Sequence, residues 1–455
     1  MTEARLYVRE SRGRYTDRRW ACVWLTQLVY FGLPWLRWDG LPAVWLDIPA
    51  RRLVLFGTLW WPHDLVLLPA LMLVAVLALF FAATLAGRVF CGYACPHSVY
   101  GEIFLWIERR IEGKPLARLR LDQAPLAAAT LGKKVAKHAA WLAFAGWTGF
   151  TLAAYCTPAP LLLAGAAQGA LGRWQLACML AYAMLAYLNA GALRARFCRF
   201  ICPWGRFQSL VIGPATRVIR YAAERGEPRA LRNRKRLPPH AAPGDCIDCT
   251  LCVQVCPTGI DIRRGEAFDC IGCGACADAC DQVMDKRGAP RGLIGYARAG
   301  PAPAGRARWR SGSAVAAALL GLAVLGFGVA ASRRAPLKLA LTHDRALALR
   351  TLDGGVVENV YRMHVINTDR RAHRYRIVVS GLDTLALDSP AQLDVEGGAG
   401  RVLPLRLQAD GAAGRAGANR IVVELVALDQ PGQRVRQDTV FFIGGWSDGS
   451  AFRRF

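Results

Sequence analysis

Eight of the fifteen cysteines in this 455-residue chain fall into two runs with the same spacing, C-x2-C-x2-C-x3-C. This spacing is typical of domains that hold two [4Fe-4S] clusters, in which the fourth cysteine of each run ligates the cluster of the other run. The spacing therefore predicts two sets of four ligands. The first set is Cys246, Cys249, Cys252 and Cys280. The second set is Cys256, Cys270, Cys273 and Cys276.

Two alternatives compete with the cluster interpretation, namely paired zinc sites and a disulfide framework. Zinc sites usually group cysteines as separated C-x2-C pairs rather than as triplets with a distant fourth cysteine. Disulfides belong to oxidising compartments, whereas the charge pattern described below places these runs in the cytosol. Small residues such as Gly272 and Gly274 suit a backbone that wraps closely around a cluster. The pattern therefore favours two [4Fe-4S] clusters.

Four further cysteines lie in two copies of the motif F-C-x3-C-P, each of which follows an apolar stretch. The chain therefore contains an internal repeat. Proline favours the first position of a helix, so each motif places its second cysteine at a helix N-terminus. We expect that position to lower the pKa of the thiol and to favour the thiolate, the form that binds metals. The four residues are Cys91, Cys95, Cys198 and Cys202.

Thiolates that converge from two repeats can hold a soft ion such as Cu(I), hold another iron–sulfur cluster, or form a redox-active dithiol pair. The plainer alternative is that these cysteines only pack, as we expect for Cys22, Cys156 and Cys178, which stand alone in or near apolar stretches. One C-x3-C motif would favour packing. Two copies in equivalent positions favour a redox or metal-binding role.

The composition predicts a membrane protein. Hydrophobic residues make up 54% of the chain, more than an ordinary soluble protein contains. A formal net charge of +25 suggests nucleic-acid binding at first, but most of the basic residues flank apolar stretches. The positive-inside rule explains that arrangement, and no RNA-recognition motif accompanies the charge. We therefore expect membrane lipid, and no nucleic acid, as a partner.

Uncharged stretches predict an α-helical membrane core of about five spans, at residues 20–36, 65–87, 139–156, 174–193 and 313–332. With the N-terminus in the cytosol, both F-C-x3-C-P motifs and the two cysteine runs lie at the cytosolic face of the membrane. An odd number of spans then places the C-terminal domain outside.

The sequence predicts a multi-domain membrane protein. Its parts are a basic tail at 1–19, a four-span core at 20–216, basic linkers at 217–240 and 291–312, an inserted two-cluster ferredoxin-like domain at 241–290, the fifth span, and a domain at 337–455. Within the core, residues 99–113 have an amphipathic helical pattern. We expect this helix either on the cytosolic membrane surface or packed on the ferredoxin-like domain.

Residues 337–455 contain no cysteine and show short stretches of alternating apolar and polar residues. Apolar positions alternate around 361–365, 403–407 and 421–425, and VFFIG adds another strand. About seven such strands with Gly, Asp and Asn turns predict an immunoglobulin-like β-sandwich. We expect its three histidines to be surface residues rather than metal ligands. They are His343, His364 and His373.

Several stretches make the chain resemble the FixG/RdxA/CcoG family, accessory proteins for assembly of the cbb-type cytochrome c oxidase. They are WLTQLVYFGLPWL, DIPARR, AGRVFCGYACP, IFLWIERRIEG, FCRFICPWGRFQS, the two cysteine runs, VMDKRGAPRGLIGYA and ENVYRMHVINTD. The resemblance implies reduction of Cu(II) to Cu(I), with the eight clustered cysteines as an electron relay. It also implies that Cys91, Cys95, Cys198 and Cys202 form the copper or redox site. One departure is His97, which stands where the family would have Gln, either neutrally or as an extra imidazole ligand.

The leading hypothesis is therefore a membrane oxidoreductase that passes electrons through two [4Fe-4S] clusters to copper. Its expected partners are oxidase assembly factors or a copper chaperone or transporter, together with an unknown electron donor. The first alternative is a membrane-anchored electron-transfer subunit between quinone and a protein partner, without copper chemistry. The second is a copper-binding scaffold with structural clusters.

Overall fold

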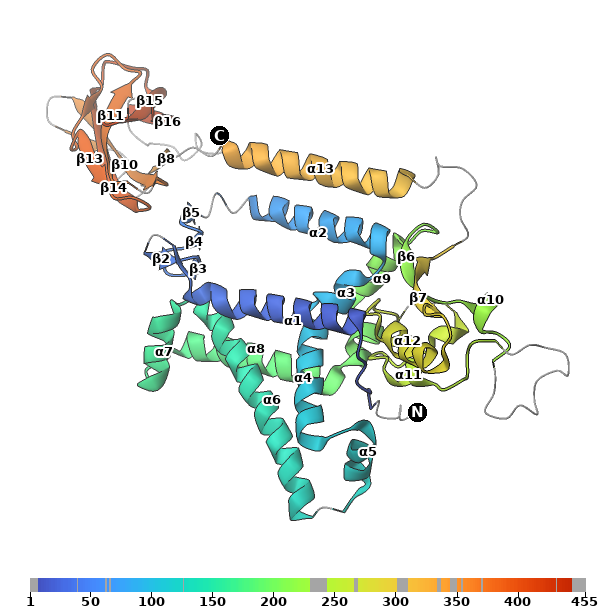
Figure 1. Ribbon diagram of the computed structural model, residues 1–455. Coiled ribbons are helices and arrows are strands. Elements are labelled where there is room, and N and C mark those ends of the chain that lie inside the picture. Colours follow the sequence, from blue (N-terminus) through green and yellow to red (C-terminus); the bar gives the residue numbers. More distant parts are fainter. Residues whose placement is uncertain are drawn as a thin grey trace. The chain divides into compact units, whose positions relative to one another are not determined.

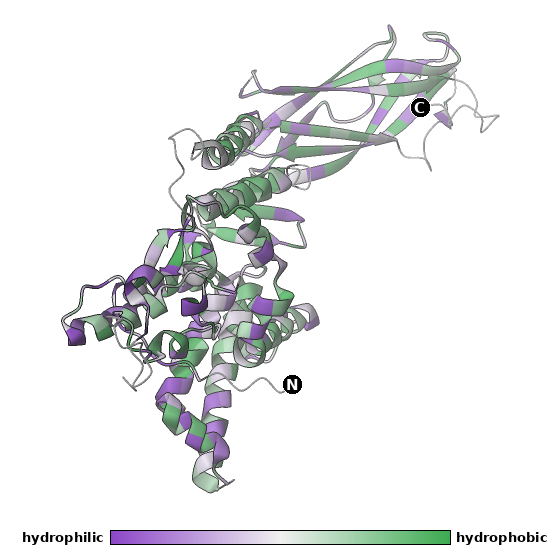
Figure 2. Cartoon of the chain, turned by 90° about the vertical axis from the view of Figure 1, so that its right-hand side faces the viewer, coloured by the Kyte–Doolittle hydropathy of each residue, from purple (hydrophilic) through white to green (hydrophobic). Residues whose placement is uncertain are grey.

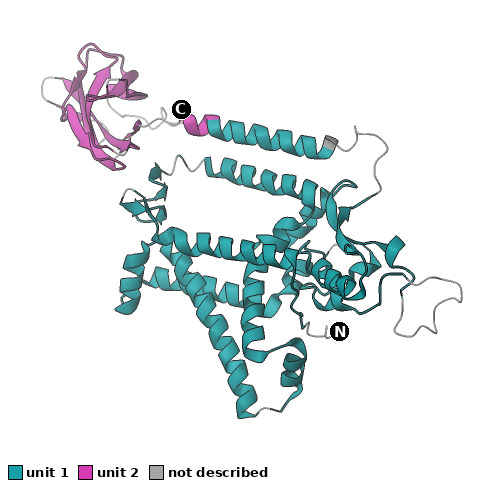
Figure 3. Cartoon of the chain, viewed as in Figure 1, with its two compact units in different colours: residues 1–328 teal, residues 329–455 magenta. Residues whose placement is uncertain are grey.

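The computed structural model of the chain divides into two compact units, residues 1–328 and 329–455 (Figure 3). Parts of the predicted tail, linkers and C-terminal domain, at 1–6, 230–240, 301–309 and 444–455, lie outside the described residues. The structure describes residues 7–38, 40–61, 64, 67–125, 127–229, 244–265, 269–300, 310–333, 337–343, 350–352, 355–369, 371–430 and 432–443.

Helices make up most of the described part of the first unit (Figure 1). The longer ones are α1 (Arg14–Gly32), α2 (Leu67–Ala86), α4 (Pro96–Glu112), α6 (Ala128–Ala154), α8 (Arg173–Tyr187) and α13 (Arg310–Ser332). The shorter helices are α3 (Val89–Tyr93), α5 (Pro115–Gln123), α7 (Ala159–Ala167), α9 (Pro203–Leu210), the 3-10 turn η1 (Leu33–Trp35), and the π-helical segments η3 (Leu188–Leu193) and η4 (Phe197–Ile201).

Three of the described helices are long and apolar enough to cross a membrane, namely Leu67–Ala86, Arg173–Leu193 and Gly312–Ser332. Little of their surface is buried inside the protein, as expected for helices that face lipid. Figure 2 shows the apolar character of the helices beside the alternating pattern of the strands. The other two predicted spans, at 20–36 and 139–156, lie within α1 and α6 and at the turn after each helix. The count of five spans stays a prediction.

The first helix begins earlier than the sequence predicts. α1 begins at Arg14, inside the predicted tail 1–19, and ends at Gly32, where η1 and Pro34 follow. Small strands then connect α1 to α2. They are β1 (Arg37–Trp38), β2 (Leu41–Pro42), β3 (Val44–Asp47), β4 (Arg52–Leu55) and β5 (Thr58–Trp60), with β3, β4 and β5 in one antiparallel sheet.

α4 packs within the helical bundle, and its predicted position, on the membrane surface or on the ferredoxin-like domain, stays a prediction. It packs mainly against α6 and η3, with Phe104 fully buried against Trp141. Three glutamates on α4 are also buried, and each forms ion pairs with cations from α4 itself or from other parts of the chain. Glu102 pairs with Arg19 and Arg109, Glu108 with Arg118 and Arg194, and Glu112 with Lys137.

A two-stranded sheet closes the ferredoxin-like domain. β6 (Arg217–Tyr221) pairs antiparallel with β7 (Ile294–Arg298) and places Ile219 opposite Tyr296. Both predicted basic linkers therefore contribute a strand to this domain, which extends beyond the predicted 241–290. Its remaining described elements are α10 (Ala223–Gly226), α11 (Leu251–Gln254), the 3-10 turn η6 (Ile262–Arg264) and α12 (Ala275–Arg287).

The second unit contains two antiparallel sheets that enclose one apolar core, as the alternating pattern predicts. The predicted strands are confirmed, and Tyr361, Leu405 and Ile421 are fully buried. One sheet has the order β12 (Ala386–Leu387), β14 (Gly400–Asp410), β10 (Val356–Asn367), β8 (Leu337–His343), with β9 (Arg350–Thr351) also on β10. The other has the order β13 (Gln392–Val395), β11 (His373–Ser380), β15 (Gly417–Ala427), β16 (Arg434–Ile443).

The expectation of surface histidines is wrong for His373, which is only 3% exposed. Its Nδ1 atom lies 2.5 Å from a carboxylate oxygen of Asp429, and its Nε2 atom lies 3.0 Å from one of Asp369. Carboxylates accept hydrogen bonds, so the ring donates from both nitrogens when both bonds form. His364 is partly exposed, and the side chain of His343 lies outside the described part.

Candidate electron-transfer site

The structure gathers the first predicted set of cluster ligands around one small cavity, which Cys246, Cys249, Cys252 and Cys280 line. A second cavity is lined by Cys256, Cys270, Cys273 and Cys276, together with Cys252. At least four cysteines around each cavity, drawn from both runs, form a donor set that suits a [4Fe-4S] cluster. The predicted exchange of the fourth cysteine between runs is therefore compatible with the fold. The ligand assignment itself stays a prediction.

The two cysteine runs have the same backbone conformation at equivalent positions. Asp248 and Gly272 each precede the second cysteine of their run, with φ of 51° and 66°. Thr250 and Gly274 each follow it, with φ of 57° and 77°. Glycine adopts this left-handed region at little cost, whereas other residues do not. The first run therefore holds two non-glycine residues in a costly conformation that matches the second run.

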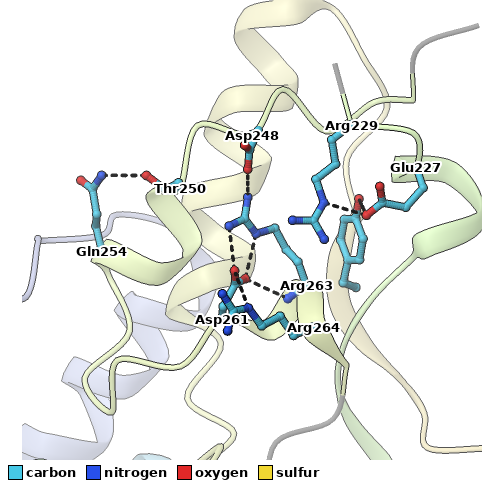
Figure 4. Close-up of polar contacts among 9 residues, drawn as sticks. Glu227, Arg229, Asp248, Thr250, Gln254, Asp261, Arg263 and Arg264 are labelled. Atoms are coloured by element: carbon cyan, nitrogen blue, oxygen red, sulfur yellow. Dashed lines mark hydrogen bonds and ion pairs between the residues drawn. The ribbon is translucent and has the colours of Figure 1, made fainter. Parts of the chain in front are cut away.

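An arginine with a buried side chain, Arg263, lines the cavity of the first cysteine set. Figure 4 shows its polar contacts. The guanidinium of Arg263 forms two hydrogen bonds of 2.8 Å to the carboxylate of Asp261 and a further ion pair with Asp248. Burial raises the pKa of Cys252 to about 11, and the charge of Arg263 acts in the opposite direction. Arg263 therefore supplies positive charge where thiolates and an anionic cluster need it.

Each F-C-x3-C-P motif ends one helix and begins another. Cys91 lies in α3, and Cys95 is the N-cap residue of α4, which begins at Pro96. In the second copy, η4 contains Cys198, and Cys202 is the N-cap residue of α9, which begins at Pro203. The predicted proline positions at the two helix starts are therefore confirmed.

The first motif and the residue Arg88 before it lie against α9, the helix that begins at the end of the second motif. The thiol of Cys91 donates a hydrogen bond of 3.1 Å to Oε1 of Gln208 on α9. The guanidinium of Arg88 lies over Gly205, where an added Cβ atom would come within 2.0 Å of its Nη2 atom. The four motif cysteines are close enough to influence one another electrostatically.

The first motif also contacts the second cysteine run directly. A Cβ atom on Gly92 would lie 2.7 Å from the carbonyl oxygen of Ile271 and 3.0 Å from the backbone of Cys273. The hydroxyl of Tyr93 donates a hydrogen bond of 3.2 Å to the carbonyl of Cys273. Cys91 shares one buried apolar cluster with these residues. The first F-C-x3-C-P motif therefore packs directly against the second cysteine run.

Comparisons with known proteins agree with this architecture. Family models match a 4Fe-4S dicluster domain at residues 193–299, a 4Fe-4S binding domain at 68–115, and the Ig-like fold at the C-terminus of FixG at 327–444. Protein RdxA of Cereibacter sphaeroides is 35% identical over 89% of this chain and 87% of its own length. Protein RdxB of the same organism is 35% identical over 96% of this chain and 95% of its own length. The chain belongs to the FixG/RdxA family.

Two further matches are weaker in coverage. Nitrogen fixation protein FixG of Rhizobium meliloti is 36% identical over 64% of this chain and 57% of its own length. A crystal structure of a FixG-related protein from Vibrio parahaemolyticus covers 24% of this chain and 97% of that chain, at 24% identity and a TM-score of 0.22, too low to inform the fold. Family membership and the cluster-domain matches make this protein a membrane iron–sulfur electron-transfer protein.

In this FixG/RdxA protein, the predicted effect of a helix N-terminus on thiol acidity is wrong in its net direction for Cys95. Burial raises the pKa of Cys95, although the backbone amides of Ser98 and His97 act to lower it. Burial and the neighbouring thiols raise the pKa of Cys198 to about 12. Desolvation therefore outweighs the helix terminus, and a bound cation would be needed to keep the thiolates. No three His, Cys, Asp or Glu side chains among the described residues are close enough to hold a single metal ion.

Asp278 on α12, within the second cysteine run, has a structural role that the sequence did not reveal. Its buried carboxylate accepts hydrogen bonds from the backbone amides of Tyr15 and Thr16, at 3.2 and 2.7 Å, and from the Thr16 hydroxyl at 2.8 Å. The carboxylate thus satisfies amides in the first turn of α1. The predicted tail is therefore attached to the ferredoxin-like domain. The contact joins residues 263 positions apart, and no local pattern marks it.

His97 lies at the start of α4, and one of its ring nitrogens is hydrogen-bonded to the backbone. Its Nε2 atom is 2.9 Å from the carbonyl oxygen of Arg194, and its ring stacks on Phe197 at 4.7 Å. Because a carbonyl oxygen only accepts, Nε2 carries the proton and Nδ1 presents a lone pair. That Nδ1 atom is buried and has no hydrogen-bond partner. Whether it ligates copper stays a prediction.

Proposed function

We propose that this protein reduces Cu(II) to Cu(I) for assembly of a cbb-type cytochrome c oxidase. The observation that carries the proposal is the contact between the first F-C-x3-C-P motif and the second cysteine run, at Gly92 and Tyr93. It places the first motif, with Cys91 and Cys95, directly against an electron-carrying domain. Such a site suits an ion that accepts one electron and then prefers sulfur ligands.

The residues have distinct roles in this proposal. The [4Fe-4S] clusters, when bound, supply electrons one at a time. Copper binds among Cys91, Cys95, Cys198 and Cys202 at the end of the path, although no three of these side chains lie close enough in the described structure to share one ion. There Cu(II) takes one electron and becomes Cu(I). Thiolates prefer the reduced ion, so the ligands themselves favour the forward reaction. Arg88 is 8% exposed beside these thiols and acts to lower the pKa of Cys91.

We place the clusters and the motif cysteines at the cytosolic face of the inner membrane and the second unit in the periplasm. The basic residues that flank the spans support this orientation. The expected partners are oxidase assembly factors or a copper chaperone or transporter, which would take Cu(I) from the motif cysteines.

The test uses the full-length protein in detergent, with reduced clusters, mixed with Cu(II) in the absence of oxygen. Re-oxidation of the clusters should match the formation of Cu(I), detected with a Cu(I)-specific chelator. The double variant Cys91→Ala/Cys95→Ala should retain its iron and lose at least ten-fold in rate. Cys178→Ala, a cysteine on α8 outside the motifs, is the matched control. Equal copper reduction by the double variant would show that the motif is not the copper site.

An iron–sulfur role for the motif cysteines is the second candidate. It is favoured because the 4Fe-4S binding match at 68–115 includes Cys91 and Cys95. Metal analysis separates the candidates, since two [4Fe-4S] clusters give about eight iron atoms per chain and three give about twelve. An electron-transfer subunit without copper chemistry would show neither Cu(I) formation nor a third cluster.

A further inference from the structure

A cavity of about 600 Å³ opens beside the second cysteine run, within the volume range of small-molecule sites. Helix α4, the end of the Arg173–Leu193 span and the loop after Cys256 all contribute to its walls. Cys198 and Ile271 line it as well. A molecule in this cavity would therefore lie next to the loops that carry the second cluster set, and next to the membrane.

The polar groups of the cavity suit a molecule that carries hydrogen-bond acceptors. Four arginines line it, and Glu102 is the one carboxylate among the lining residues. That glutamate is already held by Arg19 at 3.1 Å and by Arg109 at 3.0 Å. Two of the lining arginines also pair with carboxylates outside the cavity, Glu108 and Asp269. The lining arginines carry several N–H donors each, so carbonyl or phenolate oxygens in the cavity have donors within the lining.

The same wall offers one hydrogen-bond acceptor without a protein partner. The Nδ1 lone pair of His97 is buried, has no hydrogen-bond partner, and belongs to a residue that lines the cavity. Apolar side chains of Leu105 and Leu193 complete the lining. A ligand that matches these groups has a hydroxyl to donate to the imidazole, oxygens to accept from arginine, and an apolar body.

We propose that this cavity binds a membrane quinone in its hydroquinone form, which delivers electrons to the second [4Fe-4S] cluster. The hydroquinone is oxidised to quinone, two electrons pass singly to the clusters, and two protons leave to water. His97 accepts a hydrogen bond from the bound hydroxyl, and lining arginines donate to the opposite oxygen. The inference names the electron donor of the proposed function and rests on that function only for the final electron acceptor.

Glycines on the helices allow a direct test. Gly101 on α4 lines the cavity, and a Cβ atom there would meet nothing within 4 Å. Gly101→Leu therefore adds an apolar side chain at the cavity wall, and its Cβ atom meets no protein atom within 4 Å. Gly132 on α6 is a matched control, because it is also helical, has the same free space, and is not among the lining residues.

The reverse reaction provides the readout, because a site that oxidises hydroquinone also reduces quinone. Full-length protein in lipid nanodiscs, free of copper and oxygen, is reduced with dithionite, freed of excess reductant, and mixed with a decyl-substituted benzoquinone. Cluster absorbance should recover at a rate that saturates with quinone concentration. Gly101→Leu should lower the rate at limiting quinone at least ten-fold, and Gly132→Leu should leave it unchanged. An azidoquinone should label residues 191–199 in the wild type but not in Gly101→Leu.

Other outcomes overturn the inference. A rate that rises linearly with quinone and is equal in both glycine variants would mean that no site is involved. A flavin in the purified protein would give the cavity a different occupant. If dithionite-reduced Gly101→Leu loses Cu(II) reduction to the same extent as quinone reduction, the cavity is a route for copper. If Gly101→Leu retains no iron, Gly101→Ala replaces it, with an expected loss of about three-fold. Failure of the proposed function is separate, since it would abolish Cu(II) reduction and leave quinone reduction intact.

Discussion

Gly274 and Thr250 occupy equivalent left-handed positions in the two cysteine runs, but only Gly274 lies under an aromatic ring. A Cβ atom on Gly274 would be 2.7 Å from Cγ of Tyr15, at the start of α1. Gly274→Ala should therefore destabilise the domain by about 2–5 kcal/mol, from left-handed strain and overpacking together. The measurement is the midpoint temperature for loss of cluster absorbance.

Thr250→Ala is the control for this prediction. Threonine and alanine both carry a Cβ atom, so the left-handed strain at position 250 is the same before and after the substitution. The change removes only an exposed hydrogen bond from Gln254. It should cost less than about 1 kcal/mol. A similar loss of stability in both variants would mean that Tyr15 does not constrain the second run.

At this scale the sequence predicted most of the site. The cysteine spacing identified two sets of four residues that the structure gathers, because ligand spacing is local and specific. It did not predict the left-handed Asp248 and Thr250, since those residue types carry no signal for that conformation. It also misjudged the acidity of Cys95, because burial depends on neighbours that no motif specifies.

Helix α1 depends on α12 for its first turn. Asp278→Ala would leave buried backbone amides at Tyr15 and Thr16 without an acceptor, which typically costs about 1–2 kcal/mol. That cost corresponds to a factor of about 5–30 in the population of the detached segment. Trypsin should therefore cleave after Arg9, Arg12 or Arg14 at least five-fold faster in this variant.

The matched control lies on the same helix. Asp285 is exposed and pairs with Arg291, so Asp285→Ala should leave the cleavage rate near the wild-type value. Unchanged cleavage of Asp278→Ala would mean that the carboxylate does not hold the start of α1.

The sequence was less informative about elements than about residues. The amphipathic pattern of α4 suggested a helix either on the membrane surface or packed on the ferredoxin-like domain, with its charged side chains exposed. In the structure Glu108 is 2% exposed, because Arg118 and Arg194 reach it from separate elements. Buried charge requires partners distant in sequence, and amphipathic periodicity contains no information about them.

The two units have separate hydrophobic cores, and the second unit contains the buried His373. The stability of the second unit should therefore depend on the charge of this histidine. Burial acts to lower the pKa of His373, but its hydrogen bonds to Asp369 and Asp429 outweigh burial and raise it. Stability from the charged ring is complete below pH 6.5, the ordinary value, and is lost as pH rises through the higher folded pKa. Calorimetry of the full chain should show the second-unit transition weakening by about 1–3 kcal/mol on that rise.

His373→Gln should flatten this pH dependence, because the amide cannot become charged. A second-unit transition that weakens equally with pH in this variant would assign the effect to other groups. For the whole molecule, the sequence predicted the order of domains and the sandwich, since alternation is a local signal. The linkers were misjudged because β6 and β7 pair across more than 70 residues.

The attachment of α1 to Asp278 also has a consequence for biogenesis. Tyr15 leaves the ribosome 263 residues before Asp278, a delay of about 13–53 seconds at ordinary rates of synthesis. During that interval the first turn of α1 lacks its acceptor. The start of the chain is therefore fixed in place only after the second cysteine run has been made, so insertion of the early helices precedes the completed fold around the clusters.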